Sequence, residues 1–349
     1  MLREREITCA EAIREAMDQA MAADDRVFII GEGTPDPKGI FGTTLGLKEK
    51  YGEKRVMDMP VSENAVTGMC IGAALKGLRP IMTHQRVDFS LYALEQIINN
   101  AAKWHFMFGG VSSVPLVIRM IIGRGWGQGA QHSQNLQALF AHIPGLKVVM
   151  PATAYDAKGL LLASIEDNNP VIFLEHRWIH GLSGRVPEGR YQVPLGKAKV
   201  VNEGGDVTIV ASSYMTVEAL RAARILKDQG IGVDLIDLRT IKPLDDEMIF
   251  SSVKKTGRLV VVDSSWQTGG AAGEIIARVT EKMFASLKRV PQRIALLDMP
   301  TPSSPALTKE YYPTYRTIVE AVSGRRWQNA EAKNAVPHDV PDKSFTGPF

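Results

Sequence analysis

The sequence predicts an α/β protein in which a doubly wound, mainly parallel sheet domain is followed by a second, smaller α/β domain. Short apolar runs alternate with longer segments whose apolar residues recur at helical spacing. The run Val114–Ile122 is apolar on both faces, as expected for a strand that helices cover on both sides. The alternation stops in Gly181–Gly196, which contains several Gly and Pro residues, and then begins again.

In the first half, residues 8–22 are predicted to form an amphipathic helix, because Ile13, Ala16 and Ala20 share one helical face. The segment Gly31–Thr44 is rich in Gly, Pro and Thr and is predicted to be a surface loop. A long helix is predicted at Phe89–Phe108. The other predicted strands of this half are Val27–Gly31, Arg55–Asp58, Arg79–Gln85, Lys147–Met150 and Val171–Leu174.

The second half repeats the alternation on a smaller scale. Its predicted strands are Val207–Ser212, Gly232–Asp237, Arg258–Asp263 and Arg293–Asp298, and its predicted helices are Val217–Gln229 and Ala271–Phe284. We therefore expect domains at residues 1–190 and 197–324. Residues 325–349 contain three prolines and few aliphatic residues, so we expect an extended tail.

Composition excludes several classes of function. The chain has 349 residues, 45% of them hydrophobic and 23% charged, and its net charge of +3 is too small to argue for nucleic acid or a membrane surface. No apolar run reaches the roughly 18 residues of a membrane helix. The N-terminus carries acidic residues throughout and does not resemble a signal peptide. Cys9 and Cys70 lie far apart and are expected to be free thiols in a reducing cytoplasm.

The stretch from Met57 to Gly77 contains the strongest local indication of a functional site. Ser62 stands where a helix N-cap belongs, and Glu63 falls in the first turn. The helix that follows contains Gly68 and Gly72, which suggests that another backbone or a flat ligand approaches closely. Gly77 is expected at the C′ position. On these features alone, Glu63 could simply complement the helix dipole.

Other motifs along the chain give this stretch a functional interpretation. MPVSE precedes the Gly/Ala-rich helix, and GLRPI, DFSLYALEQIINNAAK, GAQHSQ, HIPGLKVVMPAT and EDNNPVIFLE follow in that order. With them the chain resembles the beta subunit of the thiamine-diphosphate-dependent 2-oxo-acid dehydrogenase component, of the pyruvate and branched-chain type. The resemblance extends from about Ile7 to Gly324. It implies a pyrimidine-binding first domain and a transketolase-like C-terminal domain.

The resemblance also implies roles for three side chains. Glu63 would contact N1′ of the cofactor's pyrimidine and activate the cofactor, and Phe89 would pack on the aminopyrimidine ring, although it could be an ordinary core residue. His132 follows a glycine-rich loop in GRGWGQGAQHSQ. It would lie at the thiazolium end and donate or accept protons.

A monovalent cation site is implied as well. In the family, the turn SIEDNNP and one strand carbonyl wrap an ion such as potassium, and backbone oxygens suit a hard cation. The matching residues are Leu116, Ser164, Ile165, Asp167 and Asn169. The alternative is a plain turn after a helix, since Asn and Pro favour turns in any case.

The chain lacks the GDG segment that normally holds the cofactor's diphosphate through Mg²⁺. It is therefore expected to supply only the pyrimidine half of the site, with Mg²⁺ held by a separate alpha subunit. The resemblance implies two alpha and two beta chains, and a lipoyl acyltransferase core that the C-terminal domain helps to dock.

The segment Thr83–Arg86, THQR, departs from the family pattern, in which an acidic residue usually stands at the position of Thr83. His84 and Arg86 could bind a hydroxylated or anionic substrate, or could face a partner chain. We therefore keep three hypotheses: a 2-oxo-acid dehydrogenase subunit, a split transketolase-like subunit that transfers a two-carbon unit to a sugar aldehyde, and a non-catalytic scaffold subunit.

Overall fold

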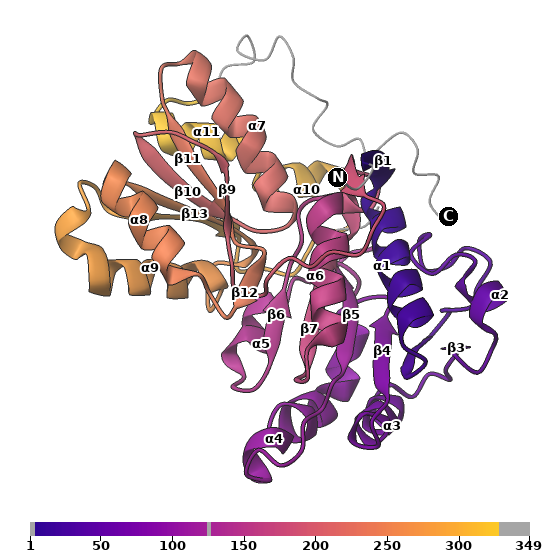
Figure 1. Cartoon of the computed structure of the whole chain (residues 1–349). Helices are drawn as coiled ribbons and strands as arrows, with labels where there is room; N and C mark the ends of the chain where they lie inside the picture. The colour runs from indigo at the N-terminus through magenta and orange to yellow at the C-terminus, as the bar shows by residue number, and fades with distance from the viewer. Residues whose placement is uncertain (1–3, 124–126, 328–349) are drawn as a thin grey trace. The chain divides into compact units, whose positions relative to one another are not determined.

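The computed structural model describes residues 4–123 and 127–327, which form two compact units (Figure 1). The first unit holds residues 4–123, 139–195 and 241–243, and the second holds residues 127–138, 196–240 and 244–327. The predicted tail beyond Trp327 and residues 124–126 of the glycine-rich loop lie outside the described residues. Within the described ranges, every helix is too short or too polar to span a bilayer.

The first unit is built on a seven-stranded sheet within the described residues, in the order β12-β6-β7-β5-β4-β2-β3. The pairs from β6 to β3 are all parallel, which confirms the predicted parallel sheet. The strands are β2 (Val27–Gly31), β3 (Val56–Met57), β4 (Arg79–His84), β5 (Val117–Ile122), β6 (Lys147–Val149), β7 (Val171–His176) and β12 (Thr240–Lys242).

Helices cover both faces of this sheet. Helices α1 (Cys9–Ala23) and α6 (Ala154–Glu166) lie side by side on one face, where their apolar residues pack on β2, β4, β5 and β7 (Figure 1). Helix α3 (Glu63–Leu75) packs on β4. The sequence analysis predicted α1 but missed α6, α2 (Leu47–Tyr51), α5 (Gln137–His142) and the antiparallel pair of β1 (Glu4–Thr8) with β8 (Ser183–Pro187).

Helix α1 begins where the sequence predicts it, because Thr8 and Glu11 form a capping box. The Thr8 hydroxyl accepts from the Glu11 amide at 3.2 Å, and the Glu11 carboxylate accepts from the Thr8 amide at 2.8 Å. These two bonds satisfy backbone amide groups that have no hydrogen-bond acceptor within the helix at its start.

The segment Phe89–Phe108 is helical, as predicted, but it is not one regular α-helix. A 3₁₀ turn at Phe89–Ala93 is followed by a π-helical stretch at Gln96–Ala101 and a short α4 (Trp104–Met107). The Ala102 amide donates to the carbonyl of Ile97, five residues earlier, at 3.0 Å. Two β-branched residues followed by two asparagines, IINN, lower α-helical propensity here and permit the wider turn.

The second unit has a five-stranded sheet in the order β14-β13-β10-β11-β9 within the described residues. All of its pairs are parallel except that of β9 with β11. Helices α7 (Tyr214–Asp228) and α11 (Tyr315–Ser323) contribute to its apolar core. Helices α8 (Asp246–Thr256) and α9 (Ala271–Met283) pack on β10 and β13. The strands are β9 (Lys199–Asn202), β10 (Val207–Ala211), β11 (Val233–Asp237), β13 (Leu259–Trp266) and β14 (Gln292–Leu296), and a short α10 (Pro305–Tyr311) precedes α11.

A buried ion pair joins two central strands of the first unit. Arg119 on β5 binds the carboxylate of Glu175 on β7 through two bonds of 2.6 and 2.9 Å, and both side chains are fully buried. His180 adds a third contact to Glu175 at 3.0 Å. Burial alone would raise the pKa of Glu175, but the charge of Arg119 and the bonds from His180 and Arg119 outweigh it and lower that pKa to about 2.

Replacing Glu175 with Gln should destabilise the chain by about 3–5 kcal/mol, because it leaves the Arg119 guanidinium buried without its counter-charge. Chemical denaturation of the full chain measures this loss. The matched control is Glu166→Gln, which breaks an exposed pair with Arg190 and should change stability by less than about 1 kcal/mol. Equal changes in the two variants would contradict the prediction.

The Glu175 carboxylate should also make the free energy of unfolding depend on pH. Since its folded-state pKa of about 2 lies below the ordinary 4.5, its contribution is fully present above pH 4.5 and is lost as the pH falls toward 2. The difference in the free energy of unfolding between the wild type and Glu175→Gln should therefore be larger at about pH 7 than at about pH 3. A difference that does not change with pH would argue against the ionised pair.

Candidate active site

Glu63 is the first residue of α3, and its side chain is buried although the helix start around it is open. The residue is only 7% exposed, and among the described residues none donates a hydrogen bond to its carboxylate. Ser62 occupies the N-cap position, as predicted, but its side chain makes no capping hydrogen bond. The carboxylate is therefore held at the helix start by a largely buried side chain and is available to a ligand or another chain.

The glycines of α3 differ in their surroundings. A Cβ on Gly68 would lie 3.3 Å from Oε1 of Gln96, so the π-helical stretch packs closely there. Nothing lies within 4 Å of a Cβ on Gly72, so the close approach predicted at that position is absent from the described residues of this chain. Gly77 has φ +92° and follows the C-cap Lys76, which confirms its predicted C′ role.

Phe89 stands at the start of the 3₁₀ turn that follows β4, and it is half-buried. Helix α3 is anchored to the same strand, because the Thr67 hydroxyl contacts the sulfur of Met82 at 3.1 Å and donates to the Glu63 carbonyl at 2.7 Å. Glu63 and Phe89 therefore both lie at the carboxyl ends of parallel strands, where open α/β sheets bind their ligands.

His132 belongs to the second unit, whereas Glu63 and Phe89 belong to the first. Its ring is half-buried, and its amide donates to the Gly129 carbonyl at 3.4 Å. Its predicted role at the cofactor stays a prediction. The neighbouring motif residue His142 ends α5 with an exposed side chain.

The residues of the predicted cation site come together in the first unit. The Val171 amide donates to the Leu116 carbonyl at 2.9 Å, which places Leu116 beside the turn that precedes β7. The carbonyls of Ile165 and Asp167 both accept from the Arg79 guanidinium, at 2.9 and 3.1 Å. Asp167 also pairs with Lys147 through its carboxylate. The remaining two residues, Ser164 and Asn169, lie in the same helix end and turn.

The sequence analysis missed two basic residues at this sheet edge. His176 ends β7 and Arg177 follows it, and both are buried. They lie across β5 from His84 and Arg86, which end and follow β4. A pair of basic residues directly after an apolar strand is a signal that could have pointed to them, because strand ends of a parallel sheet meet at one edge.

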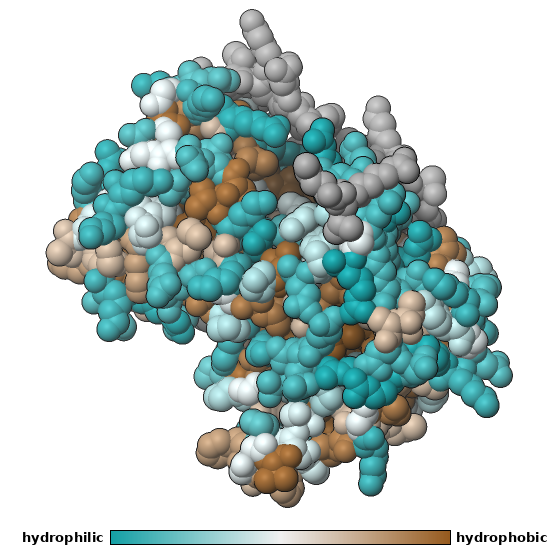
Figure 2. All heavy atoms as spheres, in the orientation of Figure 1, coloured by the Kyte–Doolittle hydropathy of each residue, from teal (hydrophilic) through white to brown (hydrophobic). Residues whose placement is uncertain are grey.

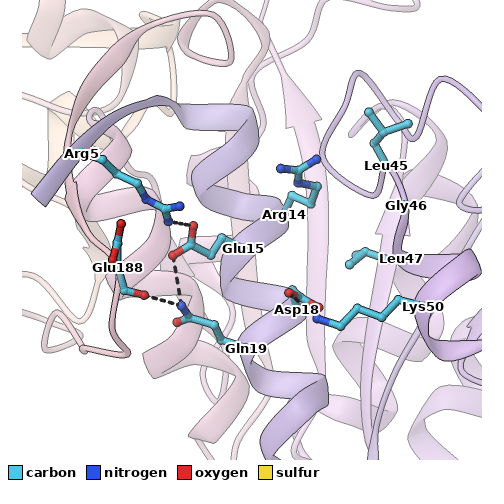
Figure 3. A pocket seen from close by; sticks show the side chains of 10 residues that line it. All are labelled: Arg5, Arg14, Glu15, Asp18, Gln19, Leu45, Gly46, Leu47, Lys50 and Glu188. Atoms are coloured by element: carbon cyan, nitrogen blue, oxygen red, sulfur yellow. Dashed lines mark hydrogen bonds and ion pairs between the residues drawn. The ribbon is translucent and has the colours of Figure 1, made fainter. Parts of the chain in front are cut away.

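A separate pocket of about 540 Å³ lies against α1 (Figure 3). Arg5 pairs with Glu15 on one side of it, and Lys50 pairs with Asp18 on the other. Arg14 lies between the two pairs, and Leu45 and Leu47 form a small apolar wall. None of the predicted site residues lines this pocket, and its charges largely neutralise one another.

Within residues 4–123 and 127–327, no group of three or more His, Cys, Asp or Glu side chains is placed to hold a metal ion. A single carboxylate such as that of Glu63, to which no described residue donates a hydrogen bond, fits the ring nitrogen of a bound heterocycle, because the two can share one proton.

Both units match known families. Residues 5–179 match the pyrimidine binding domain of transketolase, and residues 196–318 match the transketolase C-terminal domain. A solved structure of a split-gene transketolase, described as an inactive beta4 tetramer, superposes with a TM-score of 0.74 over 91% of this chain and 98% of that one. At 24% identity, this likeness shows the fold.

Relatives of higher identity span almost the whole chain. The beta subunit of acetoin:2,6-dichlorophenolindophenol oxidoreductase from Cupriavidus necator is 44% identical, with 91% of this chain and 96% of that one covered. The Rickettsia felis pyruvate dehydrogenase E1 component subunit beta is 43% identical, with 91% and 97% covered. A mitochondrial pyruvate dehydrogenase E1 beta subunit of Oryza sativa is also 43% identical, with 91% and 85% covered.

This chain matches these relatives over nearly its whole length at 43–44% identity, and both of its units match transketolase domain models, so the chain is a member of their family: the beta subunits of thiamine-diphosphate-dependent E1 components, of the pyruvate and acetoin dehydrogenase type.

Proposed function

We propose that this chain holds the pyrimidine end of thiamine diphosphate in a complex that decarboxylates a 2-oxo acid and transfers the acyl group to lipoyl-lysine. The observation that carries the proposal is Glu63 at the start of α3, a residue only 7% exposed whose carboxylate accepts no hydrogen bond from the described residues of this chain. When bound, the cofactor supplies the carbon nucleophile for the 2-oxo group and accepts the electrons released with CO₂.

Glu63 has a specific task in this proposal. Its carboxylate would hold a proton at the pyrimidine N1′ and keep the ring in the tautomer that favours catalysis. Burial keeps water from competing for that hydrogen bond. The half-buried face of Phe89 would provide a flat apolar wall against the same ring.

His132 would handle protons at the other end of the cofactor. An imidazole suits this task, because it can donate or accept a proton near neutral pH. It follows a glycine-rich loop whose described glycines, Gly127 and Gly129, have φ of +71° and +68°. Glycine adopts a positive φ at a lower energetic cost than other residues. These glycines therefore permit the turn that leads into His132.

An alpha subunit should complete the site. The relatives' names describe them as beta subunits, and we propose that two alpha and two beta chains assemble, with Mg²⁺ held by alpha. Exposed apolar side chains gather over α4 and the turn after it: Phe106, Met107, Phe108 and Val111 (Figure 2). A patch of this kind usually marks a contact between chains.

The acyl acceptor would be the lipoyl group of an acyltransferase core, docked in part by the second unit. We also propose a cytoplasmic location, which is supported by the two buried, unpaired cysteines Cys9 and Cys70. Burial raises the pKa of each thiol to about 12, so neither is a ready nucleophile or metal ligand.

Ketol transfer to a sugar aldehyde is the alternative function. It is favoured by the basic residues His84 and Arg86 at the carboxyl end of β4, which are able to bind hydroxyl or phosphate groups. It would need neither an electron acceptor nor a lipoyl partner, so one assay with both kinds of substrate separates the two functions.

Glu63→Gln should lower turnover of a 2-oxo acid by about 10²–10⁴-fold, because the amide cannot exchange the proton at N1′. The measurement is CO₂ release by the chain assembled with its alpha subunit, thiamine diphosphate and Mg²⁺, with an artificial electron acceptor. Asn64→Ala, an exposed change in the same helical turn, is the control. Undiminished turnover in Glu63→Gln would favour the scaffold hypothesis.

We further propose that a potassium ion binds the carbonyls around the SIEDNNP turn. Each carbonyl oxygen has two lone pairs, so Ile165 and Asp167 can accept from Arg79 and still coordinate an ion. The Arg79 charge opposes the ion, which makes the affinity modest.

Potassium chloride should therefore raise the melting temperature of the chain above its value in tetramethylammonium chloride at equal ionic strength. A stabilisation of about 1 kcal/mol corresponds to a rise of roughly 2–4 °C. Sodium should have a smaller effect, and identical melting curves in all three salts would show that Arg79 alone satisfies these carbonyls.

A further inference from the structure

The segment that contains His132 is held within the second unit on both sides of this residue. We call residues 127–137 the His132 segment. Burial alternates along it: Ser133, Asn135 and Gln137 are buried, with exposed fractions of 2%, 3% and 0%, whereas His132 is half-buried. This alternation is typical of an extended chain that lies on a packed surface. The buried side chains are polar, so hydrogen bonds contribute to their attachment.

Gln137 forms the anchor on the C-terminal side of His132. Its side-chain amide donates to Oδ1 of Asp263 at 2.7 Å and to Oγ of Ser264 at 3.1 Å. Both acceptors lie in β13 and are buried. A carboxylate acceptor makes such a bond stronger than a neutral acceptor does. Since Gln137 is also the first residue of α5, these bonds fix the point at which the His132 segment becomes helical.

Asp263 is itself held in one orientation by two backbone amides. Its Oδ1 also accepts from the Ser265 amide at 3.0 Å. Its Oδ2 accepts from the Ala272 amide at 3.0 Å, in the first turn of α9, where the N-cap residue Gly270 has no side chain to do so. Asp263 therefore takes the part of a capping side chain and presents a fixed acceptor to Gln137.

Ser303 forms the anchor at the other end of the His132 segment. A Cβ on Gly129 would lie 2.4 Å from Oγ of Ser303, and a Cβ on Gly127 would lie 3.5 Å from the Ser303 carbonyl oxygen. The two glycines therefore let the segment pack directly on the loop that follows β14. That loop is fixed in turn, because the Met299 carbonyl accepts from the indole of Trp266 at 2.9 Å.

We propose that Gln137 and Asp263 are positioning residues, which fix the His132 segment so that the imidazole keeps the place from which it transfers protons. The inference rests on the proposed function, because it gives the second unit the task of placing His132. Reacting groups must be held to within about 0.5 Å of their productive geometry. A misplacement of roughly 1 Å can lower the rate about 100-fold.

The variant Gln137→Met tests this proposal with little other disturbance. It keeps the length of the side chain and removes its amide, whose Oε1 is buried without a hydrogen-bond partner among the described residues. Asp263 keeps both backbone donors in this variant, so β13 and the start of α9 should remain intact. If Gln137→Met does not assemble, Gln137→Asn is the second variant, because it keeps the amide but shortens its reach by one methylene group.

Hydrogen–deuterium exchange of the complete alpha–beta complex, with thiamine diphosphate and Mg²⁺, measures the anchoring without turnover. Gln137→Met should raise amide exchange in residues 127–138 by about tenfold and leave that of α9 unchanged. Ser252→Ala, which removes a buried hydrogen bond to the carboxylate of Asp234 in the same unit, is the matched control and should leave the segment protected. Wild-type exchange of the segment in Gln137→Met would overturn the inference.

Turnover of a 2-oxo acid shows whether the anchor acts through His132. Gln137→Met should lower kcat by about 10–100-fold with little change in KM. The double variant with His132→Gln should be no slower than His132→Gln alone, because the anchor has no imidazole left to position. Losses that simply add would mean that Gln137 supports only the fold, and they would overturn the inference as well.

Exchange of the cofactor's thiazolium C2 proton is the internal reference. In the proposed function it depends on Glu63, so it should stay at the wild-type rate in Gln137→Met and fall in Glu63→Gln. An equal fall in both variants would show a general loss of structure and would contradict a positioning role. Failure of the proposed function would look different: the wild-type complex itself would release no CO₂ from any 2-oxo acid.

Discussion

The ion pair between Arg119 and Glu175 is the constraint on which the first unit depends. It joins β5 to β7 in the middle of the sheet, where both charges are removed from water. Glu175 directly precedes His176 and Arg177, so fixing its carboxylate also fixes the strand end that carries these two basic residues. An unpaired charge at Arg119 would therefore disturb the end of β7 as well as the stability of the sheet.

The carboxyl edge of the first sheet brings the candidate site residues of this unit together. Parallel strands place Glu63, Phe89 and the basic residues His84, Arg86, His176 and Arg177 at or just after their carboxyl ends. Among the described residues none donates a hydrogen bond to the carboxylate of Glu63, so it is available to a group from outside this chain. This agrees with the proposal that a cofactor binds here and that a second chain completes its site.

Particular residues show how far the sequence could be interpreted. Gly77 at the C′ position of α3 and the position of Ser62 at its N-cap followed from local rules, because each depends on neighbours within four positions. The segment Phe89–Phe108 is helical as expected, but its change from a 3₁₀ turn to a π-helical stretch was not foreseen, because periodicity does not distinguish α turns from π turns. Arg177 and His176 were missed because only strand order brings them across β5 from Arg86.

The sequence by itself determined the two α/β domains, the order of most strands along the chain, and the position of the motifs that contain Glu63, Phe89 and His132. These are properties of periodicity and of short motifs, which need no long-range contact. The tertiary structure alone decided that Glu63 is buried without a partner, that Arg79 reaches the carbonyls of the SIEDNNP turn, and that four basic residues meet at one edge. The reason is physical: burial and charge proximity arise only when strands far apart in sequence become neighbours.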